Sequence, residues 1–472
     1  MGAKRQQGKD YQMTFDFEGC GESPRHDQGG EDGIQPARLE ESQTSTASDP
    51  ARALTNRLME EICRAENLNR AYRRVKANKG SAGVDGMTVA QLRSWIAEHK
   101  GGLIAALLDG SYRPQLVRGV QIPKPGGGVR QLGIPTAIDR LVQQAILQVL
   151  EPLLDPTFSP SSFGFRPGRG AHDALKQAKK YVADGRLIVV DVDLEKFFDR
   201  VNHDILMSRL SRRIGDKRLL RIIGRFLQAG LMQDGVCVLR YEGTPQGGPL
   251  SPLLANLLLD DLDKELERRG HQFCRYADDC NIYVQTKVAG ERVLASLTRS
   301  LEGKLRLRVN REKSAVAYIE ERKFLGYRLL SGGRLGIAPK SLDRAKDRVR
   351  EITRRNRGVS LEQMTTELNS FLTGWVTYFR LAECKNHLRD LDGWLRRKLR
   401  CVRLKHCKRA KTLADFFQSL GVPEWTSWMT ALSGKGWWRL SGSPTAQHAM
   451  NQGWFDSLGL VNLVQRYVKL NS

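Results

Sequence analysis

Two adjacent acidic residues between two short apolar segments constrain this chain more than any other feature. Residues 273–284 read FCRYADDCNIYV, so Tyr276, Ala277, Asp278 and Asp279 lie between segments rich in aromatic and β-branched residues. This pattern predicts a strand, a tight turn that carries both carboxylates, and a second strand. Neighbouring carboxylates repel each other, and a bound cation that prefers oxygen ligands, such as Mg²⁺, relieves that repulsion. The alternative is a solvated Asp-Asp turn without metal chemistry.

A second acidic segment upstream favours the metal interpretation. Residues 187–199 read LIVVDVDLEKFFD, and the apolar run through Val190 predicts a buried strand. Asp191 and Asp193 are two residues apart and therefore share one face of this strand. Either acid can be structural, but Asp193 lies nearer the end of the strand, where it can face the hairpin acids across a sheet. Two metal ions about 4 Å apart, bridged by such acids, would stabilise the attacking and leaving oxygens of phosphoryl transfer.

The charge of the chain indicates a polyanionic partner. The 472 residues allow about three domains and include 76 Lys and Arg against 52 Asp and Glu, a net charge of +24. Residues 1–50 contain 5 Lys and Arg and 10 Asp and Glu, a net charge of −5, so residues 51–472 carry +29. So large an excess predicts binding to nucleic acid. Because residues 1–50 are also poor in core-forming side chains, we expect a disordered acidic N-terminal extension.

Cysteine spacing and hydropathy argue against several other classes of protein. The 8 cysteines are scattered without a C-x-x-C pair, which argues against a disulfide framework or a zinc site. No segment approaches the roughly 18 consecutive apolar residues of a membrane span, and the N-terminus lacks an apolar signal core. We therefore expect a protein of a reducing cytoplasm that has no membrane partner.

Two loops rich in glycine and basic residues are candidates for contact with nucleotides or nucleic acid. Residues 120–134 predict a β-hairpin whose turn is flanked by Lys124 and Arg130. A downstream loop carries Arg166 and Arg169 beside two phenylalanines, a combination suited to backbone phosphates and base stacking. The alternative for each pair is a set of solvated surface charges.

A third loop, at residues 243–252, has a distinctive composition. It reads GTPQGGPLSP, so three prolines and three glycines produce a stiff loop that a ligand can approach closely. Residues 76–86 are also rich in glycine and basic residues, but they lack the residue order of a P-loop, which argues against a nucleotide cradle there. Apolar periodicity predicts helices at residues 54–78, 171–183, 202–229, 252–269 and 290–304, and a short hairpin at 323–329.

The C-terminal third of the chain is predicted to be helical and basic. Residues 334–411 contain 21 Lys and Arg and 8 Asp and Glu, a net charge of +13, while their apolar residues keep helical spacing. So large an excess in one helical unit favours a phosphate-binding surface over a merely solvated face. Residues 412–472 carry five tryptophans among polar residues and predict a small additional folded unit.

Together these segments resemble a bacterial-type group II intron-encoded reverse transcriptase, also called a maturase. The resemblance covers roughly residues 54–470, and the motifs occur in the family's order. The strand that ends at Asp193, the TPQGGPLSP segment at 244–252 and the YADD sequence at 276–279 resemble the first three palm motifs. The YADD sequence is the variant typical of reverse transcriptases.

Further segments extend the resemblance. Residues 64–86 resemble the extra N-terminal block of non-retroviral enzymes, residues 310–314 and 324–326 resemble later palm motifs, and residues 368–379 resemble the maturase thumb. The longest family members end in an HNH-type nuclease with Cys pairs and His. Here the 8 histidines are dispersed and the cysteines unpaired, so we expect no such nuclease in this chain.

The resemblance implies an α+β, right-hand polymerase with an antiparallel palm sheet, helical fingers, a helical thumb and a small C-terminal domain. It implies that Asp193 and Asp278 hold two Mg²⁺ ions, with Asp279 beside them and Mn²⁺ as an alternative ion. Lys313 would be a general acid toward pyrophosphate, because a lysine near a polyphosphate can donate a proton as charge develops.

Other residues receive nucleotide and nucleic-acid roles from the same resemblance. Lys124 and Arg130 would bind the incoming triphosphate, and Gln246 would hold the nucleotide sugar. Phe198, five residues after Asp193, would be the steric gate that excludes a ribose 2′-OH. The expected contacts with nucleic acid are Arg166, Arg169, Arg396, Arg397, Lys398 and Arg400.

The expected domains are the extension at 1–50, the fingers and palm at 51–333, the thumb at 334–411 and a DNA-binding-like domain at 412–472. The implied function is an RNA-directed DNA polymerase that binds its intron RNA, aids splicing and copies that RNA into DNA during retrohoming by target-primed reverse transcription. Its expected partners are intron RNA, an RNA template with a DNA primer, target DNA and dNTPs. We expect it in the bacterial cytoplasm, associated with the nucleoid when on DNA.

Two alternatives differ in biological role. One is a reverse transcriptase that serves template-switching repair, defence or diversification, and the long maturase-like thumb argues against it. The other is a splicing-only maturase whose polymerase has decayed, and the intact Asp193, Asp278 and Asp279 argue against that one.

Overall fold

The computed structural model describes residues 55–123, 127–233, 236–238, 240–245 and 247–472. The chain forms two compact units. The first contains the described residues through Ala174 together with Val190–Ile282 and Glu291–Ala315, and the second contains Leu175–Val189, Tyr283–Gly290 and Val316–Ser472. The predicted disordered extension, residues 1–50, lies outside the described residues.

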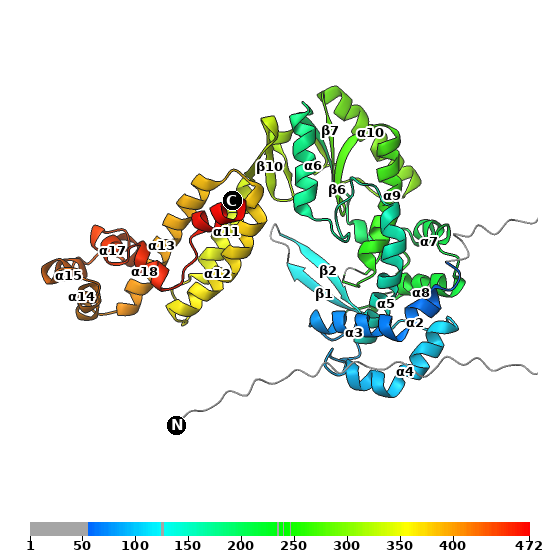
Figure 1. Cartoon of the computed structure of the whole chain (residues 1–472), viewed down its shortest axis with the longest axis horizontal. Helices are drawn as coiled ribbons and strands as arrows, with labels where there is room; N and C mark the ends of the chain where they lie inside the picture. The colour runs from blue at the N-terminus through cyan, green and yellow to red at the C-terminus, as the bar shows by residue number, and fades with distance from the viewer. Residues whose placement is uncertain (1–54, 124–126, 234–235, 239, 246) are drawn as a thin grey trace, which may run out of the picture. The chain divides into compact units, whose positions relative to one another are not determined.

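The N-terminal part of the first unit is helical (Figure 1). The predicted helix at 54–78 is two helices, because Arg64 has extended backbone angles (φ −55°, ψ 137°) and interrupts the hydrogen-bond ladder. The buried Ile62 and Leu68 lie on either side of that break. The helices are α2 (Leu58–Cys63), α3 (Ala65–Ala77), α4 (Leu92–Leu108) and α5 (Ala137–Leu154).

The predicted helix at 202–229 also divides, into α7 (His203–Ser211) and α8 (Lys217–Gln228). Asp216 begins α8 because its carboxylate accepts hydrogen bonds from the first backbone N–H groups of that helix, those of Arg218 and Leu219. The same carboxylate accepts from the backbone N–H of Met59 at 3.1 Å, which ties α2 to α8. The three other helices predicted by periodicity are present in the structure as α6 (Ala171–Ala183), α9 (Ser251–Arg268) and α10 (Lys287–Lys304).

The predicted hairpin at 120–134 is confirmed. Strands β1 (Val117–Pro123) and β2 (Val129–Ile134) pair antiparallel, with Pro123 opposite Val129 and Arg118 opposite Ile134. Strand β4 (Leu231–Gln233) pairs parallel with β1, and β5 (Val236–Val238) pairs antiparallel with β4. The four strands form a sheet in the order β2-β1-β4-β5.

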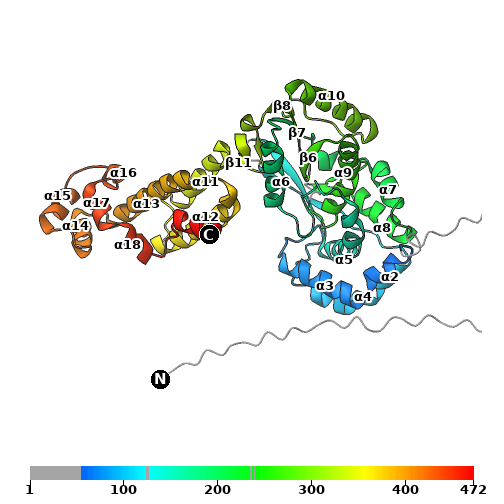
Figure 2. The same ribbon diagram turned by 45° about the horizontal axis from the view of Figure 1, so that its top comes forward.

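A second four-stranded sheet has the order β6-β7-β3-β8. Figure 2 labels three of its strands, β6, β7 and β8. Strand β3 (Ile188–Val192) is a nearly continuous apolar strand, and β6 (Gln272–Tyr276) and β7 (Asp279–Val284) follow one another across a two-residue turn. Strand β8 spans Ala315–Tyr318. Buried side chains such as Val190, Phe273 and Ile282 form the core of this sheet. The two acidic segments thus lie in neighbouring strands, β3 and β7, of one sheet, as expected from the sequence.

The second unit contains a small sheet and a set of helices. Strands β9 (Lys323–Phe324) and β10 (Tyr327–Leu330) form the predicted short hairpin, and β11 (Arg334–Ile337) extends the sheet. The helices are α11 (Pro339–Ile352), α12 (Leu361–Tyr378), α13 (Lys385–Cys407), α14 (Ala410–Ser419), α15 (Glu424–Ala431), α16 (Trp437–Leu440), α17 (Pro444–Ala449), α18 (Gln452–Ser457) and α19 (Leu463–Asn471).

The last helix, α19, packs on α12 and α13. The buried Asp392 of α13 accepts hydrogen bonds from the backbone N–H groups of Leu463 and Val464, which begin α19. The C-terminal end of the chain is therefore part of the same helical core as the basic helices. None of the helices within the described part of the chain is long and apolar enough to span a membrane.

Candidate active site

The acidic turn lies between β6 and β7. Ala277 and Asp278 form the turn, and Asp279 is the first residue of β7. Ala277 has a φ of 60°, in the left-handed region. The favoured two-residue hairpin loops have a positive φ at their first central residue, where asparagine, aspartate or glycine is common. An alanine there is strained, so the surrounding structure has to hold this turn in place.

Asp193 directly follows β3, where a loop from the segment after α10 fixes its backbone. The N–H of Asp193 donates to Ser314 Oγ at 3.0 Å, and its carbonyl accepts from the N–H of Asn310 at 2.9 Å. Its side chain keeps 38% of its surface exposed, and Lys313 Nζ lies 3.5 Å from Asp193 Oδ2. The other candidate, Asp191, lies within β3. Residues 310–314 therefore hold Lys313 beside Asp193, the carboxylate that the sequence analysis favoured as a metal ligand.

The electrostatics of the acids fit a cation. Burial raises the pKa of Asp278, and the negative charge of Asp193 raises it further, while Arg130 lowers it. Two carboxylates close to one another repel, and a bound cation between them relieves that repulsion. No three His, Cys, Asp or Glu side chains of the described residues cluster as a ready metal site. Mg²⁺ is commonly held by one or two carboxylates together with substrate phosphates, so two carboxylates fit such an ion.

A cavity of about 560 Å³ in the first unit is lined by two of the four residues predicted to bind the nucleotide. Its walls include Arg130, Phe198 and the glycines Gly247 and Gly248 of the GTPQGGPLSP loop. Phe165, whose side chain is 50% exposed, also lines it. Lys124 and Gln246, the other two predicted nucleotide contacts, lie outside the described residues.

Two adjacent phenylalanines have different environments. Phe197 is buried at 3% exposure, whereas Phe198 packs edge-on against it, with ring centroids 5.1 Å apart, and faces the cavity. The GTPQGGPLSP loop lies against the backbone here, because the N–H of Thr244 donates to Phe198 O at 2.7 Å. A Cβ on Gly243, whose φ is 87°, would lie 2.9 Å from that oxygen, so this approach requires glycine.

The sequence interpretation missed one residue that holds this loop. His203, the first residue of α7, is buried, and its Nε2 atom lies 2.6 Å from the carbonyl oxygen of Gly243. A single histidine in a helical pattern carries no signal of such a contact, which depends on the approach of two segments 40 residues apart.

Comparison with known proteins identifies the family of the chain. Residues 122–329 match the family of reverse transcriptases (RNA-dependent DNA polymerases), and residues 342–421 match the maturase-specific domain of group II introns. Protein YkfC of Escherichia coli strain K12 is 34% identical over 329 residues, which cover 61% of this chain and 86% of that protein. The group II intron-encoded protein LtrA of Lactococcus lactis subsp. cremoris is 39% identical over 195 residues, 41% of this chain and 32% of LtrA.

The chain belongs to the group II intron reverse transcriptase and maturase family. It is an RNA-directed DNA polymerase of α+β fold, and enzymes of this class bind nucleic acid and use divalent metal ions. A Cas6-RT-Cas1–Cas2 complex contains a chain that matches with a TM-score of 0.35 and 26% identity over 52% of this chain and 43% of that chain. Telomerase from Candida tropicalis matches with a TM-score of 0.39 and 16% identity over 48% of this chain and 55% of that one.

The structure does not support the predicted contact of Arg166 with nucleic acid in this reverse transcriptase. The Arg166 side chain is 3% exposed and pairs with Asp155 at 2.6 Å. It also donates to the carbonyl oxygens of Ser159 and Ser162. In this arrangement it has almost no surface with which to contact a phosphate. The glycine and arginine content of the loop suggested a phosphate site, but buried acceptors occupy this guanidinium.

Arg169 is more accessible than Arg166, although it also makes contacts within the loop. Its guanidinium donates to the carbonyl oxygen of Pro160 at 2.6 Å and lies 5.7 Å from the centroid of the Phe163 ring. Burial lowers the pKa of Arg169, but the group remains a strong base. Its contact with nucleic acid stays a prediction.

Three of the four basic residues predicted on α13 of the maturase segment pack on aromatic side chains. The Arg397 guanidinium lies 4.3 Å from the centroid of the Trp438 ring, and Lys398 Nζ lies 5.5 Å from the same ring. The Arg400 guanidinium lies 5.4 Å from the centroid of the Phe455 ring. Burial lowers the pKa of Lys398 and of Arg400. These cation–π contacts help to hold the C-terminal helices on α13. A count of basic residues in the sequence could not distinguish this packing role from RNA binding.

Arg396, the fourth predicted residue, is half-buried on the same helix. More exposed basic side chains of this unit lie on α11, at Lys385 and Arg389 near the start of α13, and in the loops around residues 354 and 408. RNA contact by the four predicted residues of α13 stays a prediction, and a test of it must separate lost RNA contacts from lost packing.

Proposed function

We propose that this reverse transcriptase copies the RNA of its own intron into DNA by target-primed reverse transcription during retrohoming, and binds that RNA to aid its splicing. The observation that carries the proposal is the presence, in one chain, of a reverse transcriptase segment and a maturase-specific segment. The net charge of +13 over residues 334–411 supports a large RNA partner. The other proposed partners are the DNA primer, target DNA and dNTPs.

In the proposed site, Asp193 and Asp278 hold two Mg²⁺ ions, or Mn²⁺ ions as an alternative, with Asp279 beside them. When bound, such metals stabilise the charge that develops on the attacking and leaving oxygens. The contribution of the chain is to hold its carboxylates in a fixed arrangement, so that little reorganisation is needed during the reaction. Asp193 follows β3 and Asp278 precedes β7, and the position of these two acids on neighbouring strands of one sheet supports this assignment.

Residues around the cavity are proposed to bind and select the nucleotide. Arg130, with Lys124, binds the triphosphate, and Gln246 holds the sugar. Phe198 excludes a ribose 2′-OH from the cavity whose wall it forms. Lys313 is the proposed proton donor to the departing pyrophosphate, and its Nζ lies 3.5 Å from Asp193 Oδ2.

We divide the chain functionally into the extension at 1–50, fingers and palm at 51–333, the thumb at 334–411 and a DNA-binding-like region at 412–472. The packing of α19 on α12 and α13 means that the last region shares its core with the thumb. The proposed location is the bacterial cytoplasm, with association to the nucleoid when the protein is on DNA.

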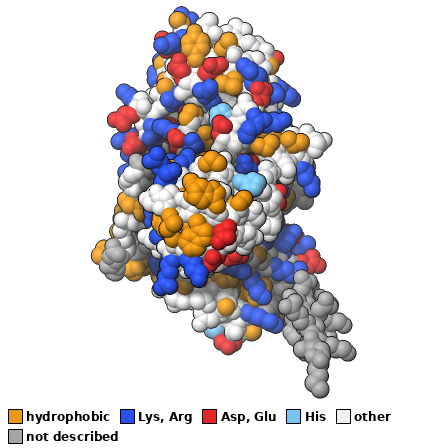
Figure 3. All heavy atoms as spheres, turned by 90° about the vertical axis from the view of Figure 1, so that its left-hand side faces the viewer, with side chains coloured by type: hydrophobic (Ala, Val, Ile, Leu, Met, Phe, Trp, Pro, Cys, Tyr) orange, Lys and Arg blue, Asp and Glu red, His pale blue; other side chains and the backbone are white. Residues whose placement is uncertain are grey.

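The surface of the second unit suits nucleic acid. Hydrophobic side chains of α15 and the residue after it, Trp425, Met429 and Leu432, are exposed. Figure 3 looks onto the side where Figure 1 draws α14 and α15, and it shows hydrophobic side chains gathered among Lys and Arg side chains. Aromatic surfaces next to basic groups can stack on bases and bind phosphates together.

Exposed charges of the thumb provide the test of RNA binding. We expect reversal of four exposed basic side chains to weaken intron-RNA binding and to impair protein-assisted splicing, while primer extension on a simple template persists. Each lost phosphate contact lowers the salt dependence of binding, so the slope of log K against log salt should flatten by up to about 3. The measurements are intron affinity over a salt series and splicing at low Mg²⁺. The four substitutions are Lys340→Glu, Arg344→Glu, Arg354→Glu and Lys408→Glu.

The matched control is Arg397→Glu, which removes a cation that packs on Trp438. We expect this variant to lower the thermal stability of the C-terminal helices, whereas the exposed-charge variant melts like the unaltered protein. A variant with all four exposed charges reversed that still splices normally would favour the repair or defence role. A protein that aids splicing but extends no primer would favour the splicing-only alternative.

A further inference from the structure

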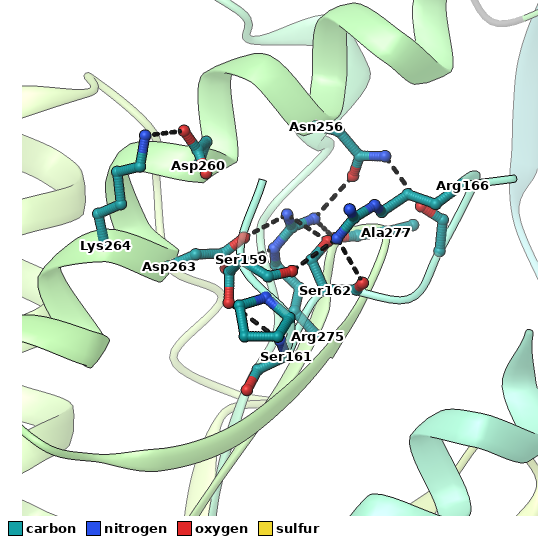
Figure 4. A network of polar contacts seen from close by, with 12 residues as sticks. Ser159, Ser161, Ser162, Arg166, Asn256, Asp260, Asp263, Lys264, Arg275 and Ala277 are labelled. Carbon is teal, nitrogen blue, oxygen red and sulfur yellow. Dashed lines mark hydrogen bonds and ion pairs between the residues drawn. The ribbon is translucent and has the colours of Figure 1, made fainter. Parts of the chain in front are cut away.

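Arg275 lies two residues before the acidic turn and is fully buried. Its guanidinium makes five hydrogen bonds, as many as it has N–H groups (Figure 4). Two go to the buried carboxylate of Asp263 on α9, at 2.7 and 2.5 Å. The others go to Asn256 Oδ1 at 2.9 Å, Ser162 Oγ at 2.8 Å and the carbonyl oxygen of Ala277 at 2.9 Å.

The stability of the fold does not by itself require this buried ion pair. Desolvation of a guanidinium and a carboxylate is costly, and well-packed apolar residues of similar volume often replace such a pair without loss of stability. What apolar residues cannot replace is the directional hydrogen bond from Arg275 to the carbonyl of Ala277. That bond constrains the residue whose left-handed φ of 60° makes the turn.

The same network holds a second loop against the turn. The N–H of Phe163 donates to Arg275 O, and the N–H of Arg275 donates to Ser161 O, both at 2.9 Å. Asn256 Nδ2 donates to the carbonyl of Gly164 at 2.9 Å. A Cβ added at Gly164 would lie 2.3 Å from the backbone nitrogen of Ala277, so the loop lies directly on the turn.

This loop continues into the nucleotide cavity. Phe165, the residue after Gly164, has a φ of 56° and forms part of the cavity wall with Phe198. The acidic turn and this part of the wall therefore share one set of buried hydrogen bonds, made by Arg275 and Asn256. A displacement of either segment would have to break these buried hydrogen bonds.

We propose that Arg275 is a positioning residue of the polymerase reaction, which holds the Asp278 turn and the Phe165 loop in one fixed arrangement so that the metal-binding carboxylate and the nucleotide cavity stay aligned. Arg275 does this through the backbone of Ala277 and the side chains of Asn256 and Ser162, and does not itself contact substrate. The inference rests on the proposed role of Asp278 as a metal ligand.

Two substitutions separate positioning from stability. Arg275→Lys keeps the charge but cannot make five hydrogen bonds in a fixed plane. The double variant Arg275→Met with Asp263→Leu removes both buried charges together, so that neither is left buried without its partner. The stability control is Leu206→Ala, a fully buried position on α7 with no part in the network.

We expect both network variants to need at least tenfold more Mg²⁺ for half-maximal single-nucleotide incorporation, with kcat lowered at least tenfold. Mn²⁺ binding, followed by electron paramagnetic resonance without substrate, should weaken in parallel. Amide hydrogen exchange should accelerate at residues 161–165 and 277–280. The Leu206→Ala protein should lose thermal stability but keep the Mg²⁺ requirement and the Mn²⁺ affinity of the unaltered protein.

The proposal would be overturned if Arg275→Lys or the double variant kept the Mg²⁺ requirement and Mn²⁺ affinity of the unaltered protein and showed unaltered amide hydrogen exchange at residues 161–165 and 277–280. If the double variant does not fold, Gly164→Ala serves in its place, because it displaces the turn without removing a charge. Asp278→Asn, measured in parallel, separates the two levels of inference. If that variant keeps Mn²⁺ binding and primer extension, the proposed metal site fails. If it loses both while the Arg275 variants behave like Leu206→Ala, only the positioning role fails.

Discussion

Substitution of Asp278 by asparagine is expected to lower template-dependent primer extension at least about 100-fold, because it removes a carboxylate that stabilises transition-state charge. The asparagine has nearly the same shape, so the turn should persist, and the basic surfaces of the second unit are untouched. Affinity for intron RNA and protein-assisted splicing should therefore remain close to those of the unaltered protein. The same loss is expected for Asp193→Asn.

Primer extension at saturating dNTP and Mg²⁺ is the measurement, with RNA affinity determined on the same preparations. Asp204→Asn, an exposed acid on α7, is the control for the change in charge and should extend primers normally. Retention of more than a few per cent of activity by the Asp278→Asn enzyme would show that the metal ligands are elsewhere.

Substitution of Phe198 by alanine is expected to reduce discrimination against ribonucleotides at least about tenfold, which corresponds to about 1.4 kcal/mol. The phenyl ring forms part of the cavity wall, and an aromatic ring beneath the sugar excludes a 2′-OH by steric contact alone. Its removal should therefore increase incorporation of ribonucleotides more than it lowers the rate with deoxynucleotides.

The ratio of kcat/KM for a dNTP to that for the matching rNTP, from single-nucleotide kinetics, checks this expectation. Phe197→Ala is a stringent control, because Phe197 is adjacent but buried and its truncation should cost about 3–5 kcal/mol of stability. If the dNTP/rNTP selectivity is unchanged in the Phe198→Ala enzyme, or changes equally in both variants, Phe198 is a packing residue and not a steric gate.

Local patterns predicted much of the first unit. The hairpin at β1 and β2, the strand before Asp193 and the turn of Asp278 follow from alternation, apolar runs and turn residues, which depend on near neighbours in the chain. The predicted helices that proved to be two, at 54–78 and 202–229, were misjudged because periodicity continues across a short break. The backbone angles of Arg64 interrupt the first helix, and the capping side chain of Asp216 begins a new one. Neither effect changes the apolar periodicity from which the helices were predicted.

The roles of single arginines were predicted less well. Arg166 and Arg397 belong to segments whose composition suggested phosphate contact, yet their guanidinium groups are used inside the protein. A count of charges treats each arginine alike, whereas burial and the direction of the side chain decide whether it meets solvent, an acid or an aromatic ring.

Sequence patterns alone predicted the chemistry proposed for this protein, because the candidate oxygen ligands Asp193 and Asp278, the stiff glycine and proline loop and the basic helical segment are all local features of the sequence. Only the tertiary structure decided how the site is held. Arg275, Asn256, Asp263 and Ser162 come from segments up to 113 residues apart, and none carries a pattern that predicts the others. The physical reason is that a buried guanidinium is stable only when its hydrogen bonds are satisfied together, a condition set by the packing of the whole unit.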